Sequence, residues 1–154
     1  DNWQFDSDAE TLACLARMGN FHAALKPYLK AAVAENAASG IPLMRPLFFD
    51  NEADEAAWSI KDQYLLGPDL LVAPVVVQGA ATRRLHLPPG AWLHLWSGGR
   101  HEAPSPSGGE LEVAAPIGSP PVFYREGSAW AGLFRAAATA AAAAAAATAA
   151  VEGS

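Results

Sequence analysis

Carboxylates, histidines and tryptophans are the residues of this chain whose chemistry could serve a site. Hydrolysis by paired carboxyl groups needs two of them on opposite walls of a pocket, roughly 5 Å apart when one acts as nucleophile. The densest acidic cluster comprises Asp50, Glu52, Asp54 and Glu55. Carboxylates in a single polar turn repel one another and stay hydrated, so this cluster predicts no catalytic pair.

A second group of candidates lies in residues 83–96, and its members are His86, His94, Trp92 and Trp96. If Pro88, Pro89 and Gly90 form the loop of a hairpin, Leu85 opposes Leu93 and the four candidates share the other face. The histidines are then not directly opposed and have no matching carboxylate or Cys nearby, so surface histidines are favoured over a metal site. The tryptophans could stack on a sugar ring, but we prefer the interpretation that they cover a neighbouring domain.

The composition excludes several classes of function. The net charge of −6 argues against nucleic acid as a partner, because phosphate binding requires clustered Lys and Arg. The single cysteine, Cys14, lies among apolar residues of a predicted helix, where a buried inert thiol is expected rather than a nucleophile. One cysteine forms no internal disulfide, which predicts a reducing, cytoplasmic location. The alanine run after residue 136 is too short and too weakly hydrophobic to predict a membrane span.

The elements that position these residues begin with two helices. Ser7 and Glu10 have the spacing of a capping box, and apolar residues then recur at helical spacing as far as Leu25. Pro27 interrupts this pattern, because proline lacks an amide hydrogen and clashes with the preceding turn. A second helical stretch follows and is predicted to end at Gly40.

The residues after Gly40 have the patterns of strands. Short apolar runs at residues 43–49, 70–77, 111–113 and 121–125, together with the hairpin, predict an antiparallel sandwich or partial barrel. Arg45 lies within the first run, where an unpaired buried charge would be costly. We therefore hypothesise that Arg45 pairs with Asp62 or Glu126 across the sheet.

The last part of the chain is rich in alanine. Residues 136–150 are Ala apart from two Thr. Alanine has the best intrinsic helix propensity, but an isolated helix of this length is marginal in water. We expect a helical or disordered tail without an apolar stripe wide enough to dock firmly.

Three motifs carry a family resemblance. They are Gly40-Ile41-Pro42-Leu43-Met44-Arg45-Pro46-Leu47-Phe48-Phe49, the run from Asp62-Gln63-Tyr64 to Val72-Ala73-Pro74-Val75, and Pro121-Val122-Phe123-Tyr124-Arg125-Glu126-Gly127. Together they resemble the C-terminal part of family 31 glycoside hydrolases, the α-glucosidase family. Four segments are most similar to the bacterial sulfoquinovosidase branch: Asn2-Trp3-Gln4-Phe5-Asp6-Ser7-Asp8, His22-Ala23-Ala24-Leu25-Lys26-Pro27-Tyr28, His94-Leu95-Trp96 and the ending Pro120 to Arg125.

The resemblance implies an α+β fragment with three parts. Residues 1–39 would be the helical end of a catalytic (β/α)8 barrel, residues 40–128 a β-sandwich domain, and residues 129–154 an Ala-rich tail without a counterpart in the family pattern. The parent would be a retaining α-glycosidase whose catalytic Asp pair lies upstream of residue 1, so the chain itself is predicted inactive.

The resemblance also implies partners and a site. The parent would bind a carbohydrate α-glycoside as substrate and would contain the missing barrel domain. It would need no cofactor or metal, and neither nucleic acid nor a membrane would be a partner. Asn2, Trp3 and Gln4 would lie near the substrate pocket, because they closely follow the last barrel strand. The alternative is a non-catalytic β-module that binds carbohydrate or has a purely structural role.

Overall fold

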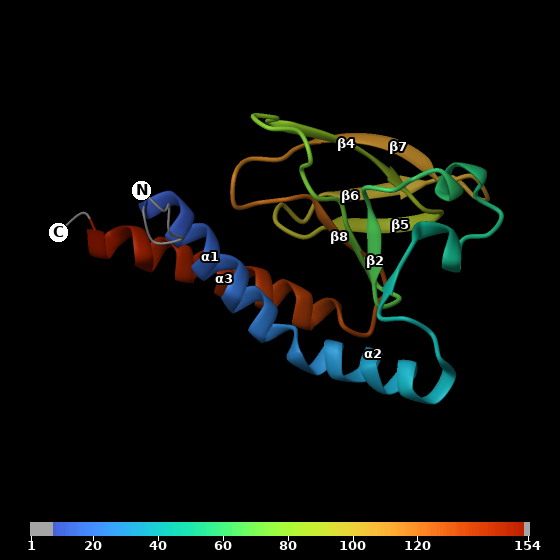
Figure 1. Cartoon of the computed structure of the whole chain (residues 1–154), viewed down its shortest axis with the longest axis horizontal. Coiled ribbons are helices and arrows are strands. Elements are labelled where there is room, and N and C mark those ends of the chain that lie inside the picture. The colour runs from blue at the N-terminus through green and yellow to red at the C-terminus, as the bar shows by residue number, and fades with distance from the viewer. Residues whose placement is uncertain (1–7, 153–154) are drawn as a thin grey trace, which may run out of the picture.

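The computed structural model describes residues 8–152, which form helices on one side of two antiparallel sheets (Figure 1). The elements in chain order are α1 (Ala9–Ala24), α2 (Lys26–Ser39), β1 (Met44–Arg45), the 3-10 helices η1 (Leu47–Asp50) and η2 (Glu55–Trp58), β2 (Tyr64–Leu66), β3 (Leu70–Val72), β4 (Thr82–Leu87), β5 (Gly90–His94), β6 (Arg100–Ala103), β7 (Gly109–Ala114), β8 (Val122–Arg125) and α3 (Ala131–Glu152).

The predicted break between the first two helices is confirmed. Asp8 caps α1, and its side chain accepts a hydrogen bond from the amide of Thr11 at 2.7 Å. The capping box proposed at Ser7 lies outside the described residues. Pro27 stands in the first turn of α2, where its missing N–H costs nothing. Gly40 ends α2 with φ +78°, a left-handed conformation that glycine adopts without strain.

The central sheet has the strand order β1-β2-β3-β8-β5-β6, with every neighbouring pair antiparallel, and β4 pairs with β7 in a second sheet. Alternate residues of the central strands enter two different cores. Leu71, Trp92 and Phe123 pack against Leu85 of the second sheet, whereas Leu70 and Tyr124 pack against the helices. The molecule therefore has three layers: helices, central sheet and small sheet.

The predicted hairpin of residues 83–96 is wrong. Leu85 on β4 pairs with Leu111 on β7, whereas Leu93 on β5 pairs with Arg100 on β6 and Tyr124 on β8. The intervening Pro88-Pro89 segment offers no amide donor for a ladder, and the chain passes there from one sheet to the other. The predicted strand at residues 43–49 is also shorter than expected, because η1 follows β1 almost at once.

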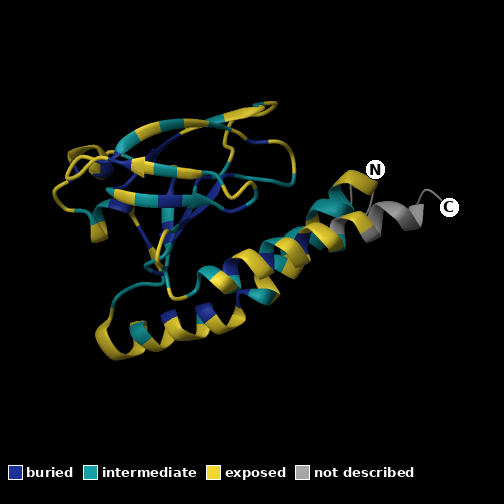
Figure 2. Ribbon diagram, turned by 180° about the vertical axis from the view of Figure 1, so that it is seen from behind, coloured by how far each residue is buried: buried dark blue, intermediate teal, exposed yellow. Residues whose placement is uncertain are grey.

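The alanine-rich segment docks on α1, contrary to our expectation. Helix α3 lies along α1 (Figure 1) and buries Phe134, Ala137 and Ala141 on one stripe. The small side chains of Ala137 and Ala141 let two helix backbones approach closely, so a narrow stripe suffices for packing. The outer surface of α2 is exposed over most of its length (Figure 2).

Candidate functional site

Tyr28 joins the helical layer to the central sheet. Its ring is buried, its hydroxyl donates to the carbonyl oxygen of Leu66 at 2.6 Å, and it accepts from the amide of Asp69 at 3.1 Å. Burial raises the pKa of the Tyr28 hydroxyl to about 12, so the group keeps its proton and remains a donor. Gly67, at φ +64°, lies against the ring, where an added Cβ would collide with the hydroxyl. The Gly67-Pro68-Asp69 turn is thus shaped to seat Tyr28.

Arg45 does not pair with Asp62 or Glu126, so that hypothesis is wrong. Its guanidinium is 3% exposed and contacts Glu35 on α2 at 2.7 Å and Asp50 at 3.1 Å. Burial disfavours the charge of Arg45, but its bonds to the two carboxylates prevail and raise its pKa. The reason for the error is η1, which turns the chain back so that a sequence neighbour reaches the guanidinium.

The carboxylates proposed for Arg45 bind other arginines. Asp62 pairs with Arg83 at 2.6 Å, and Glu126 pairs with Arg100 at 2.9 Å. The pair of Glu126 with Arg100 is exposed on both sides, where an ion pair contributes little to stability, and in the pair of Asp62 with Arg83 only the arginine is largely covered. They belong to the structural network of the sheets.

The acidic cluster is not uniformly hydrated, because Asp54 is buried. Its Oδ2 lies 2.6 Å from Nε2 of His86, which is itself buried rather than exposed as expected. The side-chain amide of Gln63 holds the His86 backbone through two hydrogen bonds, of 2.8 and 2.9 Å. Gly108 packs over the pair so closely that an added Cβ would lie 2.5 Å from Nε2 of His86. The pair joins the segments of Asp54 and His86, and Gly108 of a third segment packs against it.

The tryptophans of the supposed hairpin do not share an exposed face. Trp92 is fully buried between the sheets, and its indole donates to the Pro88 carbonyl oxygen at 2.8 Å. Trp96 is partly buried against α1, with its ring centroid 5.4 Å from that of Phe21. The guanidinium of Arg17 lies 4.4 Å above the Trp96 ring. Trp96 therefore covers a helix, and neither indole is presented for stacking on a sugar.

His94 is not placed to share a ligand with His86. Its Nδ1 lies 2.8 Å from the hydroxyl of Ser97, and its ring contacts Phe123. Burial lowers the pKa of His94, and the charge of His101 lowers it further. Among residues 8–152, no three His, Cys, Asp or Glu side chains come together in a way that could hold a metal ion.

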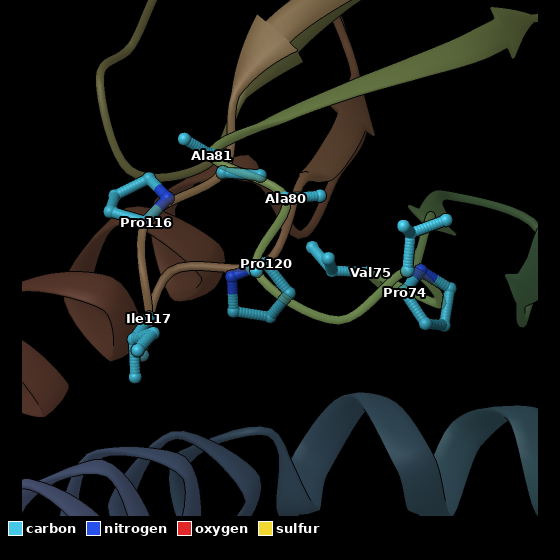
Figure 3. Close-up of a pocket in the computed structure, with 11 residues that line it drawn as sticks. Pro74, Val75, Ala80, Ala81, Pro116, Ile117 and Pro120 are labelled. Atoms are coloured by element: carbon cyan, nitrogen blue, oxygen red, sulfur yellow. The ribbon is translucent and has the colours of Figure 1, made fainter.

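One cavity, with a volume of about 480 Å³, lies between the loop after β3 and the loop before β8 (Figure 3). Its lining consists only of Pro, Val, Gly, Ala and Ile. Ile117 at the rim points towards the helices, and the same residue lines a small hollow with Cys14 and Arg17 of α1. This cavity has no side chain that could transfer a proton.

A second cavity of about 410 Å³ separates α1 from the central sheet. Met18, Phe21, Trp96 and Val122 are among its lining residues, and no carboxylate lines it. Hydrolysis of a glycosidic bond by the usual double-carboxylate route requires a facing pair. Neither of these two cavities provides one. The predicted substrate-binding residues Asn2, Trp3 and Gln4 lie outside the described residues.

These features define a class: a β-sandwich-like domain with helices on one face and, in its described part, no hydrolytic carboxylate pair at either cavity. Residues 40–129 match the glycosyl hydrolase family 31 C-terminal domain. The chain belongs to glycosyl hydrolase family 31, whose members are glycoside hydrolases.

Similar proteins are much longer than this chain. It is 55% identical to the sulfoquinovosidase of Escherichia coli (strain K12) over 134 residues and 46% identical to that of Agrobacterium fabrum over 135 residues. It is 39% identical over 126 residues to the 1,3-alpha-isomaltosidase of Kribbella flavida. The first two matches cover 87% of this chain but only 19% and 20% of the relatives. The chain thus spans about a fifth of their length.

Solved structures agree with this placement. A GH31 family sulfoquinovosidase from E. rectale, in complex with an aza-sugar inhibitor, superposes on 90% of this chain with a TM-score of 0.82 and 40% identity. A GH31 alpha-xylosidase from a soil metagenome superposes on 87% of it, with a TM-score of 0.78 and 35% identity. The matches cover 20% and 19% of those chains. In the part of our chain that the structure describes, no helix combines the length and apolar character needed to cross a membrane.

Proposed function

We propose that this chain is the C-terminal part of a retaining α-glycosidase, and that the parent enzyme hydrolyses α-glycosides of sulfoquinovose. The observation that carries the proposal is the 55% identity to a sulfoquinovosidase, against 39% to an isomaltosidase. In this proposal residues 1–39 end a catalytic (β/α)8 barrel, residues 40–128 form the β-domain and residues 129–154 form an Ala-rich extension. The catalytic Asp pair lies in the barrel, outside this chain.

The proposal gives the chain a supporting role. Tyr28 and the ion pair of Glu35 with Arg45 tie α2 to the sheets, and Trp96 contacts α1. Helices that complete a barrel must be held in position if catalytic groups elsewhere are to keep their geometry. The chain would therefore act on catalysis through the barrel and not by contact with the reacting atoms.

Two further expectations belong to the proposal. Asn2, Trp3 and Gln4 would lie near the substrate pocket of the complete enzyme, and Ala substitution there would raise KM for the sulfoquinovoside. The single Cys14 supports a cytoplasmic location for the parent.

A chimera tests the supporting role of this chain directly. The C-terminal fifth of the Escherichia coli sulfoquinovosidase would be replaced by this 154-residue chain, and hydrolysis of nitrophenyl α-sulfoquinovoside and nitrophenyl α-glucoside would be measured. We expect the chimera to cleave the sulfoquinovoside in preference to the glucoside. The truncated enzyme and the isolated chain should cleave neither, because the first lacks support and the second lacks the Asp pair.

The matched control is a chimera carrying Tyr28→Phe, which keeps the ring but removes the hydroxyl that binds the sheet. It should fold and lose part of the activity. A chimera that is folded by circular dichroism yet inactive on both glycosides would overturn the supporting role. Turnover by the isolated chain would show that the catalytic groups are not confined to the barrel.

A further inference from the structure

Trp58 is an exposed aromatic ring held in a fixed orientation. It is 56% exposed, whereas Trp92 is buried and Trp96 is partly covered. One face of Trp58 stacks on Phe48, with ring centroids 4.4 Å apart and an interplanar angle of 11°. Its indole nitrogen donates to the carbonyl oxygen of Glu52 at 3.1 Å. The ring is thus covered on one side and anchored at its edge, while the remainder meets solvent.

The ring beneath Trp58 is itself rigidly placed. Phe48 packs against the core between the sheets. The η1 and η2 segments that carry the two rings lie at the end of the molecule away from the first turn of α1 (Figure 1). A ligand at Trp58 would therefore meet a surface that loses little conformational entropy on binding.

Two glutamates lie close to the exposed ring along the chain. Glu55 and Trp58 are three residues apart in the 3-10 helix η2, and side chains at this spacing eclipse one another in such a helix. Glu52 supplies the carbonyl that holds the indole, and both glutamates are exposed. Ionised carboxylates accept hydrogen bonds and donate none, so the rim of the ring favours ligands with many hydroxyl donors.

We propose that Trp58, with Glu52 and Glu55, binds the pyranose ring of a neutral α-linked glucose oligosaccharide. The C–H face of a pyranose is flat, apolar and about the size of an indole, and its hydroxyls project from the edge towards the carboxylates. Stable protein partners bury about 800 Å² on each side, far more than one indole face offers. The two carboxylates repel an anionic ligand. The three residues line neither of the two cavities described above, and the site does not depend on the proposed activity.

The test uses the complete 154-residue chain labelled with ¹⁵N. The indole resonance of Trp58 is assigned from its loss in Trp58→Phe, and isomaltotriose is then titrated into the wild type. We expect a saturable shift at Trp58 and at no other described indole, with a Kd on the order of 1 mM because a single ring supplies the contact.

Variants separate the parts of the site. Trp58→Ala should weaken binding at least about tenfold, and Glu55→Gln should weaken it about threefold by removing the charged acceptor. Glu112→Gln removes an exposed carboxylate from β7 and should leave the Kd unchanged. Thermal melting checks that each variant is folded, and Glu55→Gln keeps the test valid if Trp58→Ala does not fold.

Three outcomes would overturn the proposal. The first is no shift at Trp58 with isomaltotriose well above the expected Kd. The second is equal binding by wild type and a folded Trp58→Ala. The third is a dimer of the wild type that light scattering shows to dissociate in Trp58→Ala, since the ring would then serve contact between copies of the chain. Failure of this proposal leaves the chimera test untouched, because the chimera reports hydrolysis and not binding at Trp58.

Discussion

Removing both carboxylate partners of Arg45 should destabilise the chain far more than removing either one. The guanidinium is 3% exposed, while the side chains of Glu35 and Asp50 are 39% and 29% exposed. Glu35→Gln leaves Asp50 to balance the charge, and the pair that it breaks is half-exposed, so the loss should be about 1 kcal/mol or less. Asp50→Asn should cost about the same for the same reason.

The double variant differs in kind from the two single variants. With both carboxylates replaced by neutral amides, the buried guanidinium loses both of its charged partners, although its Nε still donates to the carbonyl oxygen of Pro42 at 2.8 Å. Arginine cannot become neutral by losing its proton. The uncompensated buried charge should therefore lower the free energy of unfolding by about 3 kcal/mol or more. Arg45→Met removes that charge while filling similar volume, and should therefore cost less than the double variant.

Urea unfolding followed by circular dichroism measures these differences at low and at high salt. The double-mutant cycle should show a coupling energy of about 1 kcal/mol or more between Glu35 and Asp50, because each can compensate for the other. Salt should weaken the effect of the single variants more than that of the double variant. Strict additivity of the two single variants, or an Arg45→Met variant less stable than the double one, would refute the reasoning.

Three other perturbations follow from the geometry. The pKa of Tyr28 rises from 10.0 to about 12 on folding. The contribution of the neutral Tyr28 hydroxyl to the free energy of unfolding is therefore complete below pH 10 and lost as pH rises through 12. Urea unfolding should show that the wild type loses about 2 to 3 kcal/mol over this window, whereas Tyr28→Phe should not show this loss. The pKa of His94 is lowered on folding, so the folded state favours the neutral ring and loses stability as pH falls through that pKa. The urea midpoint of the wild type should therefore decrease below about pH 6.5, and the midpoint of His94→Asn should decrease less. The added Cβ of Gly108→Ala would meet atoms 2.5 to 2.6 Å away, at a residue whose φ is +64°. Gly79→Ala is the control, because it is strained only by its φ of +76° and should cost about 1 kcal/mol. Gly108→Ala should therefore lower the melting temperature much more than Gly79→Ala does.

Local features of the fold could be predicted from the sequence. Pro27 and Gly40 act through their own backbone restrictions, so the break between α1 and α2 and the end of α2 needed no knowledge of distant residues. Strands at residues 111–113 and 121–125 were likewise recognisable from their composition. Family membership came from motifs that the C-terminal domain shares with its relatives.

Features that depend on pairing could not be predicted in this way. The alternating leucines of β4 and β5 fit a hairpin and a crossover between sheets equally well, because alternation specifies a face and not a partner. The partners of Arg45 and His86 depend on where the 3-10 helices turn the chain. The docking of α3 was missed because hydrophobicity alone undervalues a stripe of alanines, whose packing rests on close approach.

The three connections between the helices and the central sheet differ in strength and range. The Tyr28 hydroxyl fixes α2 at one point, through buried bonds that water does not replace. The ion pair of Glu35 with Arg45 fixes the C-terminal turns of α2 by electrostatic attraction, which acts over a longer range but is screened by salt. Trp96 holds α1 by packing. Helices held at three separate points cannot rotate or slide independently of the sheet. Under the proposed function, the β-domain would therefore set the position of the last barrel helices.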